Sequence, residues 1–139
     1  MPGGYYLPGK LRYHMILAEM IRRPTPKELG KKIAAARAMI LGWAWEPANP
    51  GKLMTQFGRL GLFSREEQGL ALAAAAGELS AGNYAGHRPP QECTEEPFAE
   101  EEMFAFAWQS PHFGCRMYFK FVVGKTKCGV VSLHREEKR

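Results

Sequence analysis

Two runs near the C-terminus alternate between apolar and polar side chains, and they constrain the fold more than any other feature of this sequence. The runs cover residues 115–123 and 127–135, and Gly124, Lys125 and Thr126 separate them. Alternation with a period of two is typical of β-strands that bury one face, and a short link containing glycine is typical of a hairpin. The sequence therefore predicts an antiparallel β-hairpin at this end of the chain.

The register of this hairpin decides which side chains share a face. A shift by one residue would turn every side chain of the second strand to the opposite face. We expect Val123 to lie opposite Lys127, because this register brings Val131 and Leu133 onto the apolar face of the first strand. That apolar face consists of Met117, Phe119, Phe121 and Val123.

The same register gathers polar side chains on the other face of the hairpin. It places Ser132 opposite Tyr118 and His134 opposite Arg116, whereas the shifted register would place Ser132 and His134 among apolar neighbours. We therefore expect a solvent-facing cluster of cations and proton-transfer groups that contains no carboxylate. Its members are Arg116, Tyr118, Lys120, Ser132 and His134.

Helix signals dominate the sequence before this hairpin. A Thr-Pro-Lys-Glu start at Thr25 predicts a helix with a capping box that runs to about Trp45 and ends in two core tryptophans, Trp43 and Trp45. Ser64, followed by two glutamates in the first turn, predicts a helix that runs to Leu79. Further elements are expected as a helix over 10–23, a short helix over 52–60, an irregular connection over 80–97 and a strand over 103–109.

This order of elements predicts an α+β fold. N-terminal helices are expected to pack on one face of a C-terminal antiparallel sheet of three or more strands, whose polar face stays open. The length of 139 residues suits a single domain over 1–139, with a helical N-terminal part over 1–59 and a helix plus sheet over 60–139. No apolar run reaches the length of a membrane span, and no secretory signal is recognisable, so we expect a cytoplasmic protein with no membrane partner.

The charge distribution points to an anionic partner. The net charge is +5, every acidic residue is glutamate, and six of the 14 glutamates fall within residues 92–102. A basic body with one acidic segment suits nucleic acid, although a basic protein without such a partner has the same composition. The acidic segment is expected to border a substrate groove, to contact a basic partner protein or to be an ordinary solvated loop.

Several classes of chemistry find no support in the sequence. It has no phosphate-binding glycine loop and no nucleophile elbow, and the absence of aspartate argues against a serine triad and against two-metal nuclease chemistry. The pairs His87 with Cys93 and His112 with Cys115 lack the spacing of a zinc site. We expect no metal and no cofactor, and we expect the three cysteines to be free thiols.

RNA cleavage is one reaction that the polar cluster could catalyse without a metal, because the 2′-hydroxyl of RNA can attack the adjacent phosphorus. That reaction needs a base, an acid and a positive group for the phosphate. His134 suits either proton role, Lys120 and Arg116 can hold the phosphate, and Tyr118 can donate a hydrogen bond or, if nearby cations lower its pKa, exchange a proton. An ordinary solvated strand face would have the same pattern.

Residues from about Leu60 onward resemble the MqsR family of toxins, relatives of the RelE-type mRNA interferases of bacterial type II toxin–antitoxin systems. The chain departs from the family at Ala85, where some members carry a basic residue, at Leu133, where they carry phenylalanine, and over residues 1–59. The resemblance rests on Leu60-Gly61-Leu62 with the Glu66-Glu67 helix, on the segment 79–86, on Phe104-Ala105-Phe106, on Gly114 before Met117-Tyr118-Phe119-Lys120, and on the closing segment 127–134.

The resemblance implies a RelE/MqsR-like fold and a metal-independent endoribonuclease toxin that cleaves single-stranded mRNA. The implied partners are mRNA and a cognate antitoxin protein, and the ribosome is a further candidate. The expected catalytic residues are Tyr118, Lys120 and His134. The residues expected to contact RNA are Arg88, Arg116, Lys125, Lys127, Ser132, Arg135 and Tyr84. A non-catalytic module that binds RNA or protein through the same basic sheet face remains an open alternative.

Overall fold

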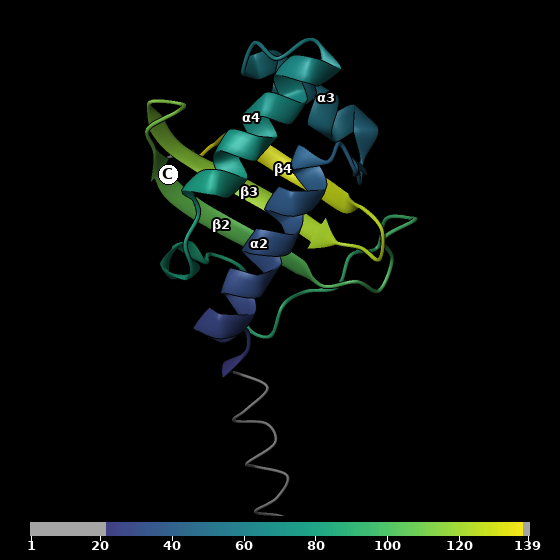
Figure 1. Ribbon diagram of the computed structural model, residues 1–139, viewed down its shortest axis with the longest axis vertical. Helices are drawn as coiled ribbons and strands as arrows, with labels where there is room; N and C mark the ends of the chain where they lie inside the picture. Colours follow the sequence, from purple (N-terminus) through teal and green to yellow (C-terminus); the bar gives the residue numbers. More distant parts are fainter. Residues whose placement is uncertain (1–21, 138–139) are drawn as a thin grey trace, which may run out of the picture.

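A four-stranded sheet covered on one face by helices forms the body of the protein over residues 22–137, which the computed structural model describes (Figure 1). The expected α+β class is confirmed. The helix expected over 10–23 lies outside the described residues, apart from its last two positions. The elements are α2 (Pro26–Leu41), β1 (Trp45–Pro47), α3 (Pro50–Arg59), α4 (Arg65–Glu78), a 3-10 turn η1 (Ala81–Asn83), β2 (Met103–Ser110), β3 (Cys115–Val123) and β4 (Cys128–Arg135).

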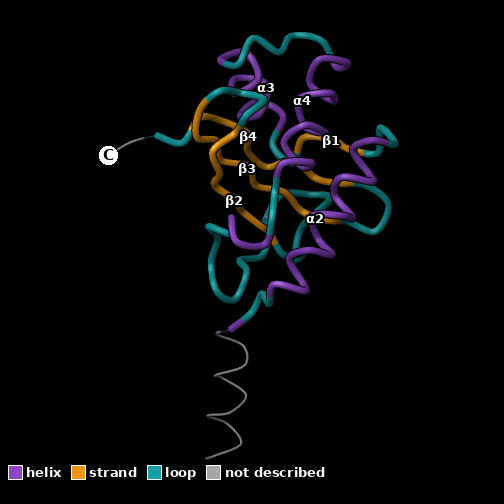
Figure 2. The backbone as a smooth tube through the Cα atoms, turned by 60° about the vertical axis from the view of Figure 1, so that its left-hand side comes forward, coloured by secondary structure: helices purple, strands orange, loops and turns teal. Residues whose placement is uncertain are grey.

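The sheet is mixed, with the strand order β1-β4-β3-β2. The three C-terminal strands are consecutive and antiparallel, as the sequence predicts. The fourth strand, β1, comes from the N-terminal part of the chain and pairs in parallel with the first half of β4. Figure 2 shows that α2 and α4 lie on one side of β2, β3 and β4. The N-terminal part therefore contributes a sheet edge as well as helices.

Helix α2 ends earlier than its sequence suggests. Thr25 caps it, accepting a hydrogen bond from the backbone N–H of Glu28 at 3.1 Å, as expected. The Glu28 carboxylate does not complete a capping box but pairs with Arg23. At the other end, the helix stops at Leu41 instead of Trp45, because Trp43 has a left-handed backbone with φ of 61°. That turn redirects the chain into β1.

The two tryptophans after α2 therefore differ in environment. Trp45 is buried at 2% exposure and contacts Phe57 edge-on, so the prediction of a core residue is confirmed for it. Trp43 is 48% exposed and lies against Gly69 of α4, where a Cβ would come within 2.5 Å of the indole ring. The prediction of a core residue is therefore wrong for Trp43, which covers the outside of α4.

The capping signals of the next two helices are confirmed. Asn49 caps α3, which starts two residues earlier than expected and ends at Arg59. Ser64 caps α4 in a complete capping box, in which Glu67 reaches back to the backbone N–H of Ser64. The small residues of α4 allow it to pack closely against α2 as well as over the sheet.

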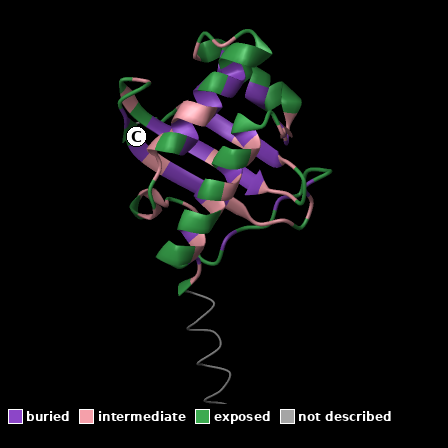
Figure 3. Cartoon of the chain, viewed as in Figure 1, coloured by how far each residue is buried: buried purple, intermediate pink, exposed green. Residues whose placement is uncertain are grey.

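The main hydrophobic core lies between the helices and the sheet, where the strands are buried beneath the exposed outer sides of the helices (Figure 3). Burial of apolar surface of this extent is the dominant stabilising contribution to a fold of this size. The inward side chains of β2 are Phe104, Phe106 and Trp108, as predicted, and those of β3 are Met117, Phe119, Phe121 and, partly buried, Val123.

The connection between β2 and β3 is attached to the end of α4 through Glu78. Its carboxylate accepts hydrogen bonds from the indole N–H of Trp108 at 3.0 Å, from the hydroxyl of Ser110 at 2.6 Å and from the backbone N–H of His112 at 2.9 Å. Burial raises the pKa of Glu78, but these three donors outweigh it and hold the pKa below its ordinary value. Helix and hairpin are thus joined by a single carboxylate.

The register of the β3–β4 hairpin differs from the prediction in a way that preserves the predicted faces for Ser132, Leu133 and His134. Val123 pairs with Cys128 instead of Lys127, which is the shifted register near the turn. A β-bulge then leaves Val131 without a partner, and beyond it Lys120 pairs with Ser132 and the register has shifted once more. The two shifts add up to two residues, so the side chains beyond the bulge keep the faces that the sequence predicts.

The bulge moves Val131 itself to an unexpected place. The predicted position on the helix-covered face is wrong, because Val131 packs with Val122 and Phe98 in a second, smaller cluster on the opposite face. Residues Cys93 and Ala48 complete this cluster. The polar face is therefore open only in part, since the segment 92–102 covers its hairpin end.

The irregular connection expected over 80–97 extends to residue 102. It contains η1, and short bridges join Tyr84 to Phe106 and Glu92 to Glu102. The carboxylate of Glu102 binds Arg23, while four of the other glutamates in the segment 92–102 are exposed. Among the helices of residues 22–137, none combines the length and apolar character that a membrane span requires.

Candidate functional site

The part of the polar sheet face that remains open holds the cluster expected from the sequence. Across β3 and β4, Tyr118 pairs with His134 and Lys120 pairs with Ser132. Both pairs are two residues away from the predicted partners, because the register is shifted by one residue at the turn and by one more at the bulge. Tyr118, Lys120 and His134 are half-buried, whereas Ser132 is only 3% exposed and lies beneath its neighbours. The expected convergence of phenol, ammonium and imidazole on one face is therefore observed.

The rings of Tyr118 and His134 stack on each other. Their centroids are 5.0 Å apart and their planes differ by 23°. The Nδ1 atom of His134 lies 2.7 Å from the carbonyl oxygen of Arg135, a contact that requires Nδ1 to carry a hydrogen. In the neutral imidazole this leaves Nε2 as the proton acceptor. Stack and hydrogen bond together fix the orientation of the ring.

Burial shifts the pKa of Tyr118 and the pKa of Lys120 in the directions that favour the uncharged side chains. Burial raises the pKa of Tyr118, so the phenol keeps its proton at neutral pH. This direction is opposite to the lowering by cations that the sequence left open. Burial also lowers the pKa of Lys120, and the positive charge of Lys52 lowers it further, while Cys93 acts in the opposite direction. Lys120 is therefore a stronger acid than an exposed lysine.

Arg116 lies on the same face of β3 by alternation, but it has a carboxylate partner. Its Nε is 2.9 Å from Oε2 of Glu136, the first residue after β4, and its backbone oxygen accepts the N–H of Glu136. The expectation of a cluster with no carboxylate is therefore wrong at this position. Both side chains are largely exposed, and an exposed pair of this kind contributes about 1 kcal/mol or less.

Helix α3 forms a wall along the open edge of β4, which the sequence did not predict. Pairing with β1 ends at Val130, and beyond it the side chain of Gln56 accepts the backbone N–H of Leu133 at 2.9 Å. The spacing of Lys52, Gln56 and Arg59 places them on one face of a helix. That periodicity is visible in the sequence, but the position of the helix beside β4 is not.

Two of the expected RNA contacts, Lys125 and Lys127, lie away from this cluster. They flank the turn at the hairpin end, where Lys127 pairs with Glu46 at 3.0 Å and Lys125 lies near Glu100 and Glu101. Arg116 lies near the other end of the nine-residue strand β3, which spans roughly 30 Å. The structure does not bring these lysines to the candidate site.

Tyr84 and Arg88 also lie outside the polar face. Tyr84 contacts Phe106 edge-on at the outer edge of β2, on the helix-covered side, and its hydroxyl donates to the carbonyl of His87. Arg88 lies over the Tyr84 ring and donates to the backbone oxygen of Pro24 at 2.9 Å. These contacts fasten the segment before α2 to the loop after η1, so their evident role is structural.

Arg135 faces away from Tyr118, because it pairs with Met117 on the opposite face of the sheet. Its side chain is exposed, however, and it lines a small hollow of about 100 Å³ together with His134 and Arg59. Arg135 therefore borders the candidate site at the end of β4 but does not lie on the polar face.

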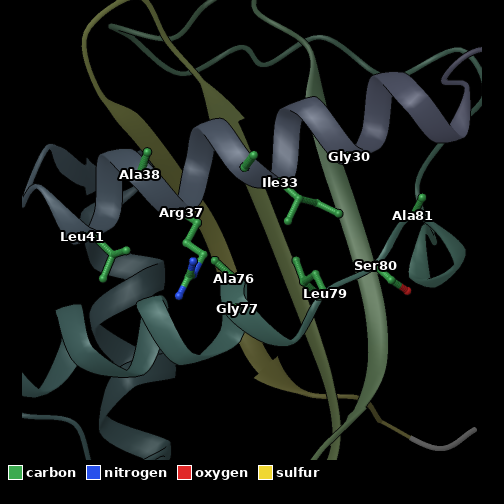
Figure 4. Close-up of a pocket in the computed structure, with 11 residues that line it drawn as sticks. Gly30, Ile33, Arg37, Ala38, Leu41, Ala76, Gly77, Leu79, Ser80 and Ala81 are labelled. Carbon is green, nitrogen blue, oxygen red and sulfur yellow. The ribbon is translucent and has the colours of Figure 1, made fainter.

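A larger groove, of about 550 Å³, lies between α2 and α4 on the other side of the sheet (Figure 4). Ile33 and Leu41 of α2 and Leu79 after α4 line it, and Arg37 points into it toward Gly77. Its remaining lining consists mainly of small aliphatic residues, which supply neither a base nor a nucleophile. The acid–base groups are on the opposite face.

Within the part of the chain that the structure describes, no group of three His, Cys or carboxylate side chains is arranged to hold a metal ion. All three cysteines are free: Cys93 and Cys128 are buried and Cys115 is partly exposed. A comparison with protein-family models finds no matching family, and comparisons with curated proteins and with solved structures find no match either. The function therefore has to be argued from the geometry.

Proposed function

We propose that this protein is a metal-independent endoribonuclease that cleaves single-stranded mRNA through attack of the RNA 2′-hydroxyl on the adjacent phosphorus. The observation that carries the proposal is the stacked pair Tyr118–His134 next to Lys120, with Nδ1 of the imidazole held by a backbone carbonyl. A base, a hydrogen-bond donor and a cation on one exposed face are the groups that this reaction needs.

The residues take distinct roles in this mechanism. Nε2 of His134 removes the proton of the 2′-hydroxyl as the bond from the 2′-oxygen to phosphorus forms. Tyr118, which keeps its proton because burial raises its pKa, donates a hydrogen bond to a non-bridging phosphate oxygen. Lys120 stabilises the added negative charge and gives its proton to the 5′-oxygen as the phosphorus–oxygen bond breaks. The products are a 2′,3′-cyclic phosphate and a 5′-hydroxyl.

The biological role proposed for this activity is that of a toxin with a RelE/MqsR-like fold, neutralised by a cognate antitoxin protein. Support comes from the resemblance of residues 60–134 to that family and from the helix-plus-sheet architecture, which is compatible with it. The proposed setting is the cytoplasm, where translated mRNA, with or without the ribosome, is the substrate.

A cleavage assay with matched variants tests the proposal. Purified protein is incubated with a long RNA in EDTA, and the 3′ ends of the fragments are analysed. We expect cyclic phosphate ends with wild-type protein, and a loss of roughly 100- to 10,000-fold in rate for His134→Ala and Lys120→Ala, the range for a general acid or base. The controls His112→Ala and Lys31→Ala change exposed residues outside the cluster and should cleave like wild type.

Growth on expression gives the corresponding result in cells. Wild-type protein should arrest growth, and His134→Ala and Lys120→Ala should not, while circular dichroism shows that both remain folded. Full toxicity and full cleavage by both variants would contradict the assignment of the site.

A second candidate function is a non-catalytic RNA-binding module, and the same stack favours it. Paired aromatic rings on an open sheet face are a platform on which a nucleobase can stack, a contact worth about 1–3 kcal/mol per base. In the cleavage assay this alternative predicts a mobility shift with intact RNA at every incubation time.

A further inference from the structure

Helix α3 is fixed against the strand that carries His134. The hydrogen bond from the Leu133 N–H to Gln56 is buried, and Leu133 lies between Ser132 and His134 in the sequence of β4. Leu53 and Phe57, on the inner side of the same helix, are fully buried in the main core. Helix and strand are thus joined, and the face of α3 that carries Gln56 has a defined place beside the candidate site.

The same face carries two exposed cations, Lys52 and Arg59, one helical turn before and one after Gln56. Lys52 is close enough to Lys120 for the two charges to repel each other, which contributes to the lowered pKa of Lys120. Arg59 lines the small hollow with His134, Arg135 and Glu137. The two cations therefore flank the catalytic cluster at two different points along β4.

The charge of this wall suits a polyanion. Helix α3 has no acidic residue, and neither Lys52 nor Arg59 forms an ion pair with any residue in 22–137. The two residues are seven positions apart, which corresponds to two helical turns and to a separation of roughly 10 Å along the axis. One phosphate group cannot bridge that separation, so two cations on this line would contact different phosphates of one strand.

We propose that α3 is the phosphate-binding wall of the RNA site, with Lys52 sharing the phosphate held by Lys120 and Arg59 holding a neighbouring phosphate beside His134. This inference rests on the proposed function, and it adds a path for the substrate: the single strand follows the line between α3 and β4. The hairpin tip with Lys125 and Lys127 then lies off that path.

Salt-dependent binding tests the wall separately from cleavage. The probe is a mixed-sequence single-stranded 2′-O-methyl oligonucleotide, which lacks the attacking hydroxyl and stays intact. Its dissociation constant is measured by fluorescence anisotropy over a range of salt concentrations for wild type, for Lys52→Ala/Arg59→Ala, and for the control Lys27→Ala/Lys31→Ala. The control removes the same number of exposed charges from α2, on the helix-covered side.

Each phosphate contact to a single strand contributes about −0.7 to the slope of log affinity against log salt concentration. We expect the slope of the Lys52/Arg59 double variant to fall in magnitude by about 0.7 to 1.4, because Lys120 still contacts the phosphate that it shares with Lys52, and its binding at low salt to weaken by about tenfold or more. The control should behave like wild type. The single variants Lys52→Arg and Arg59→Lys keep the charge and should retain most of the affinity.

The outcomes separate the two proposals. If the double variant keeps the wild-type slope, or if the control pair loses as much, the phosphate-binding wall is wrong even when RNA is cleaved. If wild-type protein does not bind the oligonucleotide at any salt concentration, both the wall and the RNA-directed function are wrong. If binding follows the expectation but RNA is never cleaved, the wall stands and the cleavage proposal falls.

Arg59 also complements the dipole at the C-terminal end of α3, so its loss is expected to lower the melting temperature slightly. Thermal melting of each variant is therefore recorded beside the binding curves. A double variant that melts like the control but binds less tightly supports a direct role in phosphate contact.

Discussion

The ring of Phe98 lies over Gly129 so closely that a Cβ at residue 129 would be 2.7 Å from two of its carbon atoms. Phe98 is 3% exposed and forms the centre of the small cluster on the polar face with Cys93 and Val122. The acidic segment 92–102 is thus held on the sheet by one aromatic side chain and by the absence of a side chain beneath it.

Substitution at either member of this contact should destabilise the fold. We expect Phe98→Ala to lower the free energy of unfolding by about 3–5 kcal/mol, as for other buried phenylalanines, and Gly129→Ala to lower it by about 1–3 kcal/mol through overpacking. Urea unfolding measures both. Gly30→Ala is the control, because it adds a methyl group to α2 with nothing within 4 Å, and it should raise stability by about 0.5–1 kcal/mol.

Glu78 gives a prediction for the pH dependence of stability. Its pKa is lowered in the folded protein, so its contribution is fully present above the ordinary glutamate pKa of about 4.3 and is lost as pH falls through the lower folded value. Glu78→Gln should cost about 1–3 kcal/mol at neutral pH and flatten the fall in stability below pH of about 4. Urea midpoints recorded against pH test this, with the exposed Glu96→Gln as control; parallel curves for wild type and Glu78→Gln would contradict it.

The interaction of Lys52 with Lys120 can be measured without any substrate. We expect NMR titration of the Lys120 side chain to give a pKa below the ordinary lysine value of about 10.4, because burial and then Lys52 lower it. Lys52→Ala should raise that pKa part of the way back, since the burial remains, and Lys31→Ala should leave it unchanged. An unchanged Lys120 titration in Lys52→Ala would show that the two ammonium groups do not interact.

The three cysteines should differ sharply in reactivity. Burial raises the pKa of Cys128 to about 12, so its thiol stays protonated at neutral pH and is also inaccessible. Cys93 is buried as well, while Cys115 is partly exposed. With Ellman's reagent we expect one thiol to react in the native protein, all three to react in denaturant, and Cys115→Ser to remove the native reaction. Rapid modification of Cys128 in the native protein would contradict the buried position of this side chain in β4.

The strands of the hairpin were predictable because alternation reports burial directly. The pairing across the hairpin was not, although the sequence contains its signal: Val130 and Val131 are consecutive apolar residues, and they interrupt the alternation where the bulge lies. The prediction placed Val131 on the apolar face and did not use Val130. It reached the correct faces for Ser132 and His134 because the two shifts add up to two residues, the period of the alternation.

Other features had no local signal at all. Strand β1 has three residues and ends in proline, which is compatible only with a sheet edge and does not stand out in a sequence. The end of α2 at Leu41 depends on the turn into that strand. Likewise, the position of α3 beside β4, and hence the contribution of Lys52 and Arg59, follows from where β1 stops pairing.

The candidate site was predictable to the extent that it lies on one strand pair. Tyr118 and Lys120 share a face because of alternation alone, whereas His134 joins them through the register that holds beyond the bulge. Lys125 and Lys127 were expected to contact RNA, but their positions in the sequence do not show that the turn lies far from Tyr118 and His134. Tyr84 and Arg88 were assigned to RNA, but they bind to the core edge and to the backbone before α2.

The bulge in β4 decides which side chains reach the open face of the sheet. Val130 pairs with Phe121 and Ser132 pairs with Lys120, so the strand accommodates Val131 as an extra residue between these two pairs. If Val131 were paired with Lys120 instead, every side chain after it would exchange sides, the imidazole of His134 would be turned under the helices, and Leu133 would be presented to water. The acid–base surface therefore depends on an irregularity in the strand, and deleting Val131 would close that irregularity without changing the faces of Ser132 and His134.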